Sequence, residues 1–300
     1  MFAPPPEIWA EVLTRLPDEL RRSEPATEWA SGKPVHSFLE GPVFDREGNL
    51  WLVDIPHGRI FCVGPAGAWR TAVHYDGWPN GLALCADGRL AIADHKRGLL
   101  SLDLVSGAIE PLLERRGREA FKGLNDVIVS RAGDLYFTDQ GDTGLHDSSG
   151  RLYRLRRDGR LDTLLDTVPS PNGLVLTPDE GILYLAVTRA NQVWRVPLRD
   201  DGAVGRVGVF LQLQGGLAGP DGLAMDRHGN LAIAHNGLGT AWLVDRLGEP
   251  LLRIRSPAGL AVTNLAFDPA EEGRLVMTES ETGAVLTARC GGLRPAAAPA

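Results

Sequence analysis

Cysteine is scarce in this chain of 300 residues, which has Cys62, Cys85 and Cys290 and no others. Three cysteines spread along the sequence cannot build a disulfide framework, so we expect them to be reduced residues of the core. Long hydrophobic runs are also missing, and none approaches the roughly 18 residues needed to cross a bilayer. The N-terminus lacks a basic start followed by an apolar segment, which disfavours a secretory signal. These absences predict a cytoplasmic protein without a membrane partner.

Motifs of several enzyme and ligand classes are absent as well. No Gly-x-Ser-x-Gly elbow occurs, which disfavours a serine hydrolase. The glycine-rich segment 215–219 precedes an expected strand rather than a helix, which argues against a phosphate cradle. The histidines lack metal-type local spacing, so a His-rich zinc site is not expected. A net charge of −7 argues against a nucleic-acid partner, which would need clustered Lys and Arg.

The chain contains one pattern six times: a polar residue after a turn, a short apolar strand, a turn with Gly, and a second apolar strand. The polar residues of successive copies are 40, 45, 47, 49 and 43 positions apart. Such a period, with two more strands per copy and no helical spacing, is typical of a β-propeller. We therefore predict an all-β fold, a six-bladed β-propeller with four-stranded blades. The six polar residues are Glu40, Asn80, Asn125, Asn172, Asp221 and Asn264.

The ends of the chain lie outside this repeat. Apolar residues within 7–20 are spaced as in a short amphipathic helix that ends before Pro17 and packs on the propeller or a second subunit. The sixth copy has three strands, so closure by the N-terminal segment is expected, and Thr27 to Phe38 is the predicted source of the missing outer strand. The expected division is an extension with a short helix over 1–22, the propeller over 23–290 and a flexible Pro/Ala tail over 291–300.

Two carboxylates and four carboxamides should converge at one mouth of the propeller. The first strand of each blade lines the central channel, so the six polar residues that enter these strands form a ring. Oxygen donors of this kind suit a hard divalent cation, Ca²⁺ above all, with Mg²⁺ or Mn²⁺ as alternatives. Without a cation, Glu40 and Asp221 would be two like charges in a concave site. Ordinary turn chemistry also explains a single Asn or Asp well, but it explains Glu40 less well, because Glu is a poor turn residue.

Three of the six copies carry a family resemblance. Leu39-Glu-Gly-Pro-Val-Phe, Ser170-Pro-Asn-Gly-Leu and Gly219-Pro-Asp-Gly-Leu-Ala-Met-Asp resemble the motifs of the SMP-30/gluconolactonase/LRE family of six-bladed propeller lactonases. The resemblance implies one divalent cation, usually Ca²⁺ and sometimes Zn²⁺, held by Glu40, Asn172 and Asp221. It also implies that Asn125 faces the substrate and the metal-bound water.

The reaction expected from this resemblance is hydrolysis of a small-molecule lactone to a hydroxy acid. A cation that holds the lactone carbonyl oxygen stabilises the oxyanion and lowers the pKa of bound water. Asp221 would then be both a metal ligand and the general base. A non-catalytic propeller that binds a metabolite or a protein, and a same-fold enzyme with other ester chemistry, are the alternatives.

Four further residues are candidates for substrate contact. The longest loop of the active face runs from Gln140 to Gly150 and carries His146. Arg189 follows the second strand of the fourth copy and could neutralise a product carboxylate, and Asn264 belongs to the ring. Some sugar lactonases of the family have an Arg where this chain has Gly123, which shifts the expectation away from a sugar lactone. Both a monomer and a homodimer agree with the sequence.

Overall fold

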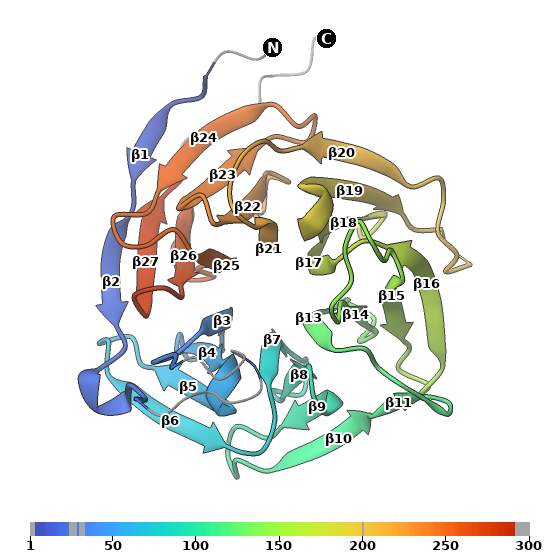
Figure 1. The fold of residues 1–300 in the computed structure, drawn as a ribbon, viewed down its shortest axis with the longest axis horizontal. Helices are drawn as coiled ribbons and strands as arrows, with labels where there is room; N and C mark the ends of the chain where they lie inside the picture. Colours follow the sequence, from blue (N-terminus) through green and yellow to red (C-terminus); the bar gives the residue numbers. More distant parts are fainter. Residues whose placement is uncertain (1–3, 24–28, 30–33, 200, 292–300) are drawn as a thin grey trace.

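A computed structural model describes residues 4–23, 29, 34–199 and 201–291. Six sheets stand around a central channel, with β3, β7, β13, β17, β21 and β25 innermost (Figure 1). The protein is therefore the six-bladed β-propeller that the repeat predicts. None of the short helical turns in these residues is long or apolar enough to cross a membrane.

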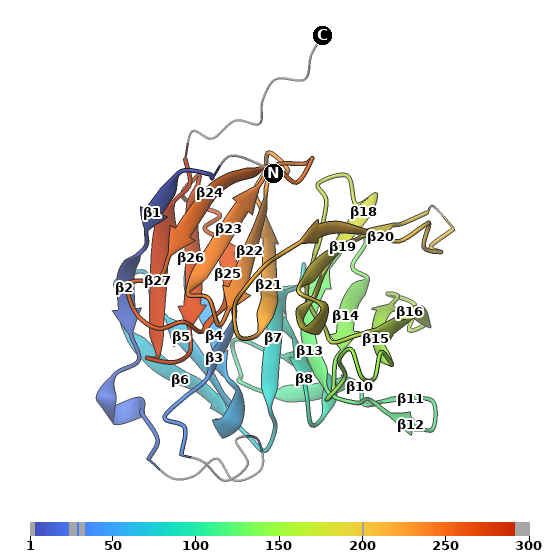
Figure 2. The ribbon, with the colours of Figure 1, turned by 45° about the horizontal axis from the view of Figure 1, so that its top comes forward.

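In blades one to three the chain runs outward from the channel, each strand antiparallel to the one before. Blade one contains β3 (Leu39–Phe44), β4 (Leu50–Asp54), β5 (Arg59–Val63) and β6 (Trp69–His74). Blade two contains β7 (Pro79–Leu84), β8 (Leu90–Asp94), β9 (Gly98–Leu102) and β10 (Ile109–Leu113). Blade three contains β13 (Leu124–Val129), β14 (Leu135–Asp139), β15 (Gly150–Leu155) and β16 (Leu161–Val168). A small hairpin of β11 (Arg115–Arg116) and β12 (Glu119–Ala120) projects at the periphery (Figure 2).

Blades four to six repeat this order. Blade four contains β17 (Pro171–Leu176), β18 (Ile182–Val187), β19 (Gln192–Pro197) and β20 (Gly208–Gln212). Blade five contains β21 (Gly219–Met225), β22 (Leu231–Asn236), β23 (Thr240–Val244) and β24 (Pro250–Arg255). Blade six contains β25 (Val262–Phe267), β26 (Arg274–Glu279) and β27 (Ala284–Arg289). In the part of the chain that the structure describes, three short 3-10 turns lie outside the strands: η1 (Asp18–Leu20), η2 (Ile55–His57) and η3 (Thr188–Ala190).

The core is divided among the interfaces between neighbouring blades. Between blades one and two, Val53 and Ile60 of the first pack with Ile92 and Leu100 of the second, all completely buried. The second strands bury every residue in blades one to three, whereas the outer strand β10 leaves its middle residues exposed. This gradient matches the more polar outer strands predicted from the sequence, because an outer strand has one face toward water.

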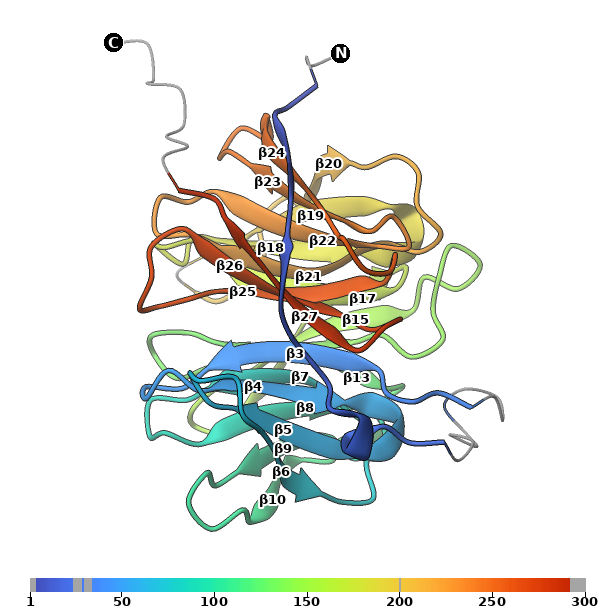
Figure 3. The same ribbon diagram turned by 90° about the vertical axis from the view of Figure 1, so that its left-hand side faces the viewer.

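The N-terminal segment closes the propeller with two strands. β1 (Glu7–Trp9) pairs in parallel with β24 of blade five, and β2 (Glu11–Arg15) pairs antiparallel with β27 of blade six. Figure 3 shows this segment crossing the outer edges of both blades. Closure by the N-terminus, expected from the missing strand of the sixth copy, is thus confirmed.

The short helix predicted within 7–20 is wrong, because most of this range is β1 and β2. The unpaired outer edges of β24 and β27 offer backbone partners that outweigh the helical spacing. Trp9, Val12 and Leu13, which the helix would have buried, are 65%, 37% and 41% exposed. The outer strand of blade six is β2 and not the segment Thr27 to Phe38, of which 27, 28 and 30–33 lie outside the described residues. Residues 292–300 of the predicted tail also lie outside them.

Candidate active site

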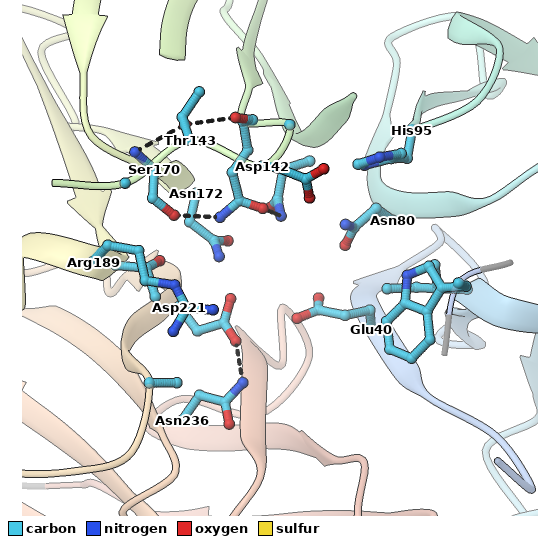
Figure 4. A pocket seen from close by; sticks show the side chains of 18 of the residues that line it. Glu40, Asn80, His95, Asp142, Thr143, Ser170, Asn172, Arg189, Asp221 and Asn236 are labelled. Carbon is cyan, nitrogen blue, oxygen red and sulfur yellow. Dashed lines mark hydrogen bonds between the residues drawn. The ribbon is translucent and has the colours of Figure 1, made fainter. Parts of the chain in front are cut away.

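Five of the six ring residues line one cavity of about 720 Å³ at the end of the channel. Each ring residue sits near the start of an inner strand, at a register shift in the pairing with the second strand. A bulge at such a position re-aims a side chain out of the sheet, here toward the channel. The five are Glu40, Asn80, Asn125, Asn172 and Asp221. Figure 4 shows Glu40 and Asp221 facing each other across the opening.

Asparagine 264, the sixth ring residue and a predicted substrate contact, lies behind the cavity. Its side-chain Nδ2 donates to Glu40 Oε2 at 2.8 Å, and its Oδ1 accepts the backbone N–H of Leu265 at 2.8 Å. It is buried and does not belong to the described lining of the cavity. Asn264 therefore supports Glu40 from below the site.

Glycine follows the ring residue where inner strands touch at the axis. A Cβ on Gly173 would lie 2.4 Å from the carbonyl oxygen of Asp221, and one on Gly222 would lie 2.0 Å from Asn264 Oδ1. Both distances are too short for any side chain. The recurring dipeptides of a polar residue and Gly thus reflect the close approach of neighbouring blades rather than turn chemistry alone.

Aspartate residues hold the entries of the first three inner strands. Asp54, Asp94 and Asp139 end the second strands of their blades. Their Oδ1 atoms accept the backbone N–H of Phe38 at 2.7 Å, of Trp78 at 3.2 Å and of Gly123 at 2.9 Å. Each of these amides lies two positions before a ring residue, so the bonds fix where Glu40, Asn80 and Asn125 enter the channel.

A third buried carboxylate, which the sequence reasoning missed, lies beside the ring. Asp126 stands where blades one, two, four and five have Gly, and its Oδ1 lies 2.3 Å from where a Cβ of Gly81 would be. It therefore fills the space that Gly81 leaves empty. Its carboxylate accepts the N–H of Val127 at 2.8 Å, and burial raises its pKa to about 7. The available signal was the Asn125-Asp126 pair, which places a carboxylate where four of the six copies have Gly.

The three carboxylates destabilise one another's charged forms. Burial, and then the charges of Asp221 and Asp126, raise the pKa of Glu40 well above its usual value, against hydrogen bonds from Gly41 and Asn264. Burial raises the pKa of Asp221 to about 7, although Asn236 donates to its Oδ2 at 2.8 Å and Asn172 also hydrogen-bonds it. Within the described residues, no Lys or Arg forms a salt bridge with any of the three.

This donor set fits a hard divalent cation. The charge of Arg189 lowers the pKa of Asp221, but among the described residues no salt bridge neutralises these buried carboxylates, so they gain from a bound positive charge. Carboxylate and carboxamide oxygens are the ligands that Ca²⁺ prefers. Among residues 4–23, 29, 34–199 and 201–291, no three His, Cys, Asp or Glu side chains gather closely enough to hold a metal by themselves. A cation here would need carboxamide oxygen as well, and Asn172 beside Asp221 offers it.

The other predicted contact residues lie above the ring. Gln140, His146 and Arg189 all line the cavity, and the amide of Gln140 bonds to Asn125 and Ser170. A Cβ on Gly144 would lie 3.2 Å from His146 Nδ1 and 3.5 Å from Arg189 Cγ, so the loop packs beside Arg189. Arg189 forms no salt bridge with any residue of the described ranges.

One wall of the cavity has residues that the sequence reasoning did not select. His95 packs against Gly123, where an added Cβ would lie 2.2 Å from the ring, so no side chain fits at position 123. Burial lowers the pKa of His95, which favours a neutral imidazole. Trp29 and Phe38, whose ring centroids are 4.7 Å apart, add an apolar surface on the same cavity. The site thus combines carboxyl and carboxamide groups at the bottom of the cavity with a partly apolar wall.

Sequence comparisons show which known proteins this chain resembles. Residues 38–281 match the family described as SMP-30/Gluconolactonase/LRE-like region. Lactonase drp35 of Staphylococcus epidermidis is 29% identical over 281 residues, 87% of this chain and 86% of the relative. Lactonase drp35 of Staphylococcus aureus strain MRSA252 is 29% identical over 235 residues, 73% of this chain and 70% of the relative.

Solved structures share the fold. XC5397 of Xanthomonas campestris, described as a gluconolactonase, matches with a TM-score of 0.74 and 27% identity over 84% of this chain and 85% of that one. Regucalcin of Agrobacterium tumefaciens, described as a calcium-binding protein, matches with a TM-score of 0.78 and 23% identity over 98% and 99%. The family match over residues 38–281 covers most of the chain and all six inner strands. The chain therefore belongs to the SMP-30/gluconolactonase/LRE-like family.

Proposed function

We propose that this protein is a divalent-cation-dependent lactonase that opens a lactone ring to a hydroxy acid. The observation that carries the proposal is the electrostatic repulsion among three buried carboxylates, Glu40, Asp126 and Asp221, none of which forms a salt bridge with a described Lys or Arg. The names of the relatives, lactonase drp35 and gluconolactonase, support the reaction class.

Glu40, Asn172 and Asp221 would hold the cation, with Ca²⁺ as the first choice and Zn²⁺, Mn²⁺ or Mg²⁺ as alternatives. When bound, the cation supplies stabilisation of the carbonyl oxyanion and acidifies a water. Asn236 donates to Asp221 Oδ2 and Asn172 also hydrogen-bonds this carboxylate, so Asp221 would be held in place to orient the attacking water and accept its proton. The water oxygen bonds to the carbonyl carbon, the ring C–O bond breaks, and the ring oxygen takes up a proton to give the hydroxyl of the product.

The cavity suits a small lactone with limited hydroxylation. His95 fills the space beside Gly123, so this wall offers a neutral imidazole and no guanidinium. Trp29, Phe38 and Ile55 add apolar surface. Arg189 carries a charge that could pair with the carboxylate formed on ring opening.

We also infer a reducing, cytoplasmic setting. Cys62, Cys85 and Cys290 are free thiols, as expected from the sequence. Disulfides are the rule in oxidising compartments, and a chain with three unpaired cysteines fits a reducing one. The proposed substrate is a small molecule, and neither a nucleic acid nor a membrane is proposed as a partner.

The test is hydrolysis of a panel of aliphatic, aryl and sugar lactones on protein stripped with a chelator and given back one cation at a time. Proton release is followed with a pH indicator, and cation binding by calorimetry. We expect one cation to restore activity to the wild type and none to restore it to Asp221→Ala. A wild type that binds a cation tightly but opens no lactone would favour a metabolite-binding propeller, and one that binds no cation would remove the site assignment.

A further inference from the structure

Gln140 lies on the cavity, but both ends of its side-chain amide are already engaged. Its Oε1 accepts Asn125 Nδ2 at 2.8 Å, and its Nε2 donates to Ser170 Oγ at 2.9 Å. Its backbone N–H donates to the carbonyl oxygen of Gly123 at 3.0 Å. The residue is therefore built into the wall rather than left free for a substrate.

The bonds of Gln140 belong to a closed circuit between blades three and four. Thr143 Oγ1 donates to the backbone oxygen of Gln140 at 2.6 Å, and the N–H of Ser170 donates back to Thr143 Oγ1 at 3.1 Å. The circuit closes through the bond from Gln140 Nε2 to the hydroxyl of Ser170. Figure 4 shows Thr143 and Ser170 on the cavity wall above Asn172. Linked hydrogen bonds of this kind restrain every member of the circuit.

The backbone of Ser170 is an independent indication that the circuit belongs to a functional site. Its φ is 65°, in the left-handed region, which residues other than glycine rarely adopt. Its amide and its hydroxyl both take part in the circuit, which compensates the unfavourable backbone. Ser170 stands two positions before Asn172, so the strained turn sets where this ring residue enters the cavity.

The circuit also decides how Asn125 faces the cavity. A carboxamide has a donor end and an acceptor end of nearly equal shape, and a rotation of 180° exchanges them. Gln140 Oε1 can accept a hydrogen bond but cannot donate one, so it holds the NH₂ group of Asn125. Asn125 Oδ1 forms no hydrogen bond with any described residue and is left to the cavity, beside the carboxylates.

We propose that Gln140 is a positioning residue that turns the Asn125 carboxamide so that its oxygen, and not its NH₂ group, faces the cation and the attacking water. The proposal rests on the cation site of the proposed function. It changes the role expected for Gln140 from substrate contact to orientation of a neighbour. In this role, the hydrogen bond from Gln140 in blade three to Ser170, two positions before Asn172 in blade four, holds the Gln140 amide in place.

The first test needs no cation and no substrate. In protein labelled with ¹⁵N-asparagine and stripped with chelator, the side-chain NH₂ signals of Asn125 are assigned by their loss in Asn125→Asp. We expect slow hydrogen exchange at this NH₂ in the wild type and in Gln140→Glu, whose carboxylate still accepts from Asn125. In Gln140→Leu the protection should disappear. Equal protection in Gln140→Leu and the wild type would overturn the proposal.

The second test measures Ca²⁺ affinity by calorimetry and kcat and KM with the lactone found active. Loss of an outer-shell partner typically costs about 10- to 100-fold in metal affinity, and we expect Gln140→Leu to fall in this range. Gln140→Glu should retain much more of the Ca²⁺ affinity. For either variant, the loss of activity should appear in kcat rather than in KM. In an Asn125→Asp background, Gln140→Leu should cost little, because a carboxylate presents oxygen in either orientation.

Gln212→Leu is the matched control, because Gln212 Oε1 also accepts a glutamine amide, that of Gln192 at 2.8 Å, outside the cavity. Gln140→Glu and Gln140→Leu that are equally impaired would overturn the proposal, since a donor end of Gln140 would then be the needed one. A wild type that binds no cation defeats the proposed function, whereas the exchange measurement still decides the orientation of Asn125.

Discussion

Asn264 Nδ2 lies 2.8 Å from Glu40 Oε2, across the boundary between blades six and one. The same side chain also hydrogen-bonds Asp126. One carboxamide therefore connects two of the three buried carboxylates from beneath the cavity. In the proposed cation site, a residue in this place would act on the cation through Glu40 rather than on the substrate.

Replacement of Asn264 by Leu should weaken cation binding without a specific effect on lactone KM. We expect a loss of about 10- to 100-fold in Ca²⁺ affinity, as for other residues that orient metal ligands. The unpaired carboxylate should also lower the free energy of unfolding by about 1–3 kcal/mol. Asn80→Leu is the matched control, because Asn80 lies in the ring and lines the cavity. Equal losses of Ca²⁺ affinity in both variants would contradict the role given to Asn264.

The cation-free protein should lose stability as the pH rises through the window between the ordinary and the folded pKa values of Asp126 and Asp221. These values are 3.8 and about 7 for both groups. Within this window the folded protein holds protons that the unfolded chain has released, so the free energy of unfolding falls as the pH rises. Glu40, whose pKa is also raised, adds to the decline in the same direction. Bound Ca²⁺ should remove most of the decline, because it stabilises the deprotonated carboxylates.

Asp126→Asn tests this linkage directly. The variant should show a shallower fall in melting temperature between pH 5 and pH 8 in chelator, and at pH 8 it should melt a few degrees above the wild type. Roughly 1 kcal/mol corresponds to about 2–4 °C for a chain of about this size. Its Ca²⁺ affinity should be lower. Identical pH slopes for the two proteins would show that Asp126 does not titrate as its burial implies.

Gly222→Ala should destabilise the propeller at the axis. The added Cβ would lie 2.0 Å from Asn264 Oδ1 and 2.6 Å from its Cα, and a buried backbone cannot move aside without disturbing the next blade. We expect a loss of about 1–3 kcal/mol or more, measured by chemical denaturation. Gly208→Ala serves as the control, since nothing lies within 4 Å of its added Cβ. A Gly222→Ala protein as stable as this control would argue against close contact of the inner strands.

Removal of β1 and β2 should leave an insoluble protein. Deletion of residues 1–16 exposes the outer edges of β24 and β27, and unpaired strand edges promote aggregation. It also removes Leu16, which is 1% exposed and packs against Leu39 and Val276. Deletion of residues 1–4, which leaves both strands intact, should keep the protein soluble. A soluble, cooperatively melting protein without residues 1–16 would show that the ring closes without them.

The sequence was sufficient for those features that recur in every blade. The spacing of Glu40, Asn172 and Asp221 placed them on inner strands, and the structure brings them to one cavity. Features that depend on contacts between distant segments were not predictable in the same way. Residues 7–15 have helical spacing, yet the open edges of β24 and β27, about 250 or more residues away, draw them into strands.

Individual side chains of the site also depend on contacts between blades that the repeat does not show. Asn264 shares the register of the ring, but it points to Glu40 because the neighbouring blades touch where Gly222 has no side chain. His95 carries no local motif and reaches the cavity because Gly123 leaves room for its ring. Periodicity along the chain could not show either relationship, since both depend on packing between blades.

The pairing of β2 with β27 also constrains how this protein is made. β2 is synthesised long before its partner β27, Ala284–Arg289, because almost the whole propeller separates them in the sequence. Blades one to five can form during synthesis, but the ring cannot be completed until β27 has left the ribosome. Contacts of such large sequence separation are slow to form. During that interval the nascent chain must keep β2 from pairing with other strands, and Glu11 and Arg15 on this exposed strand would disfavour such pairing.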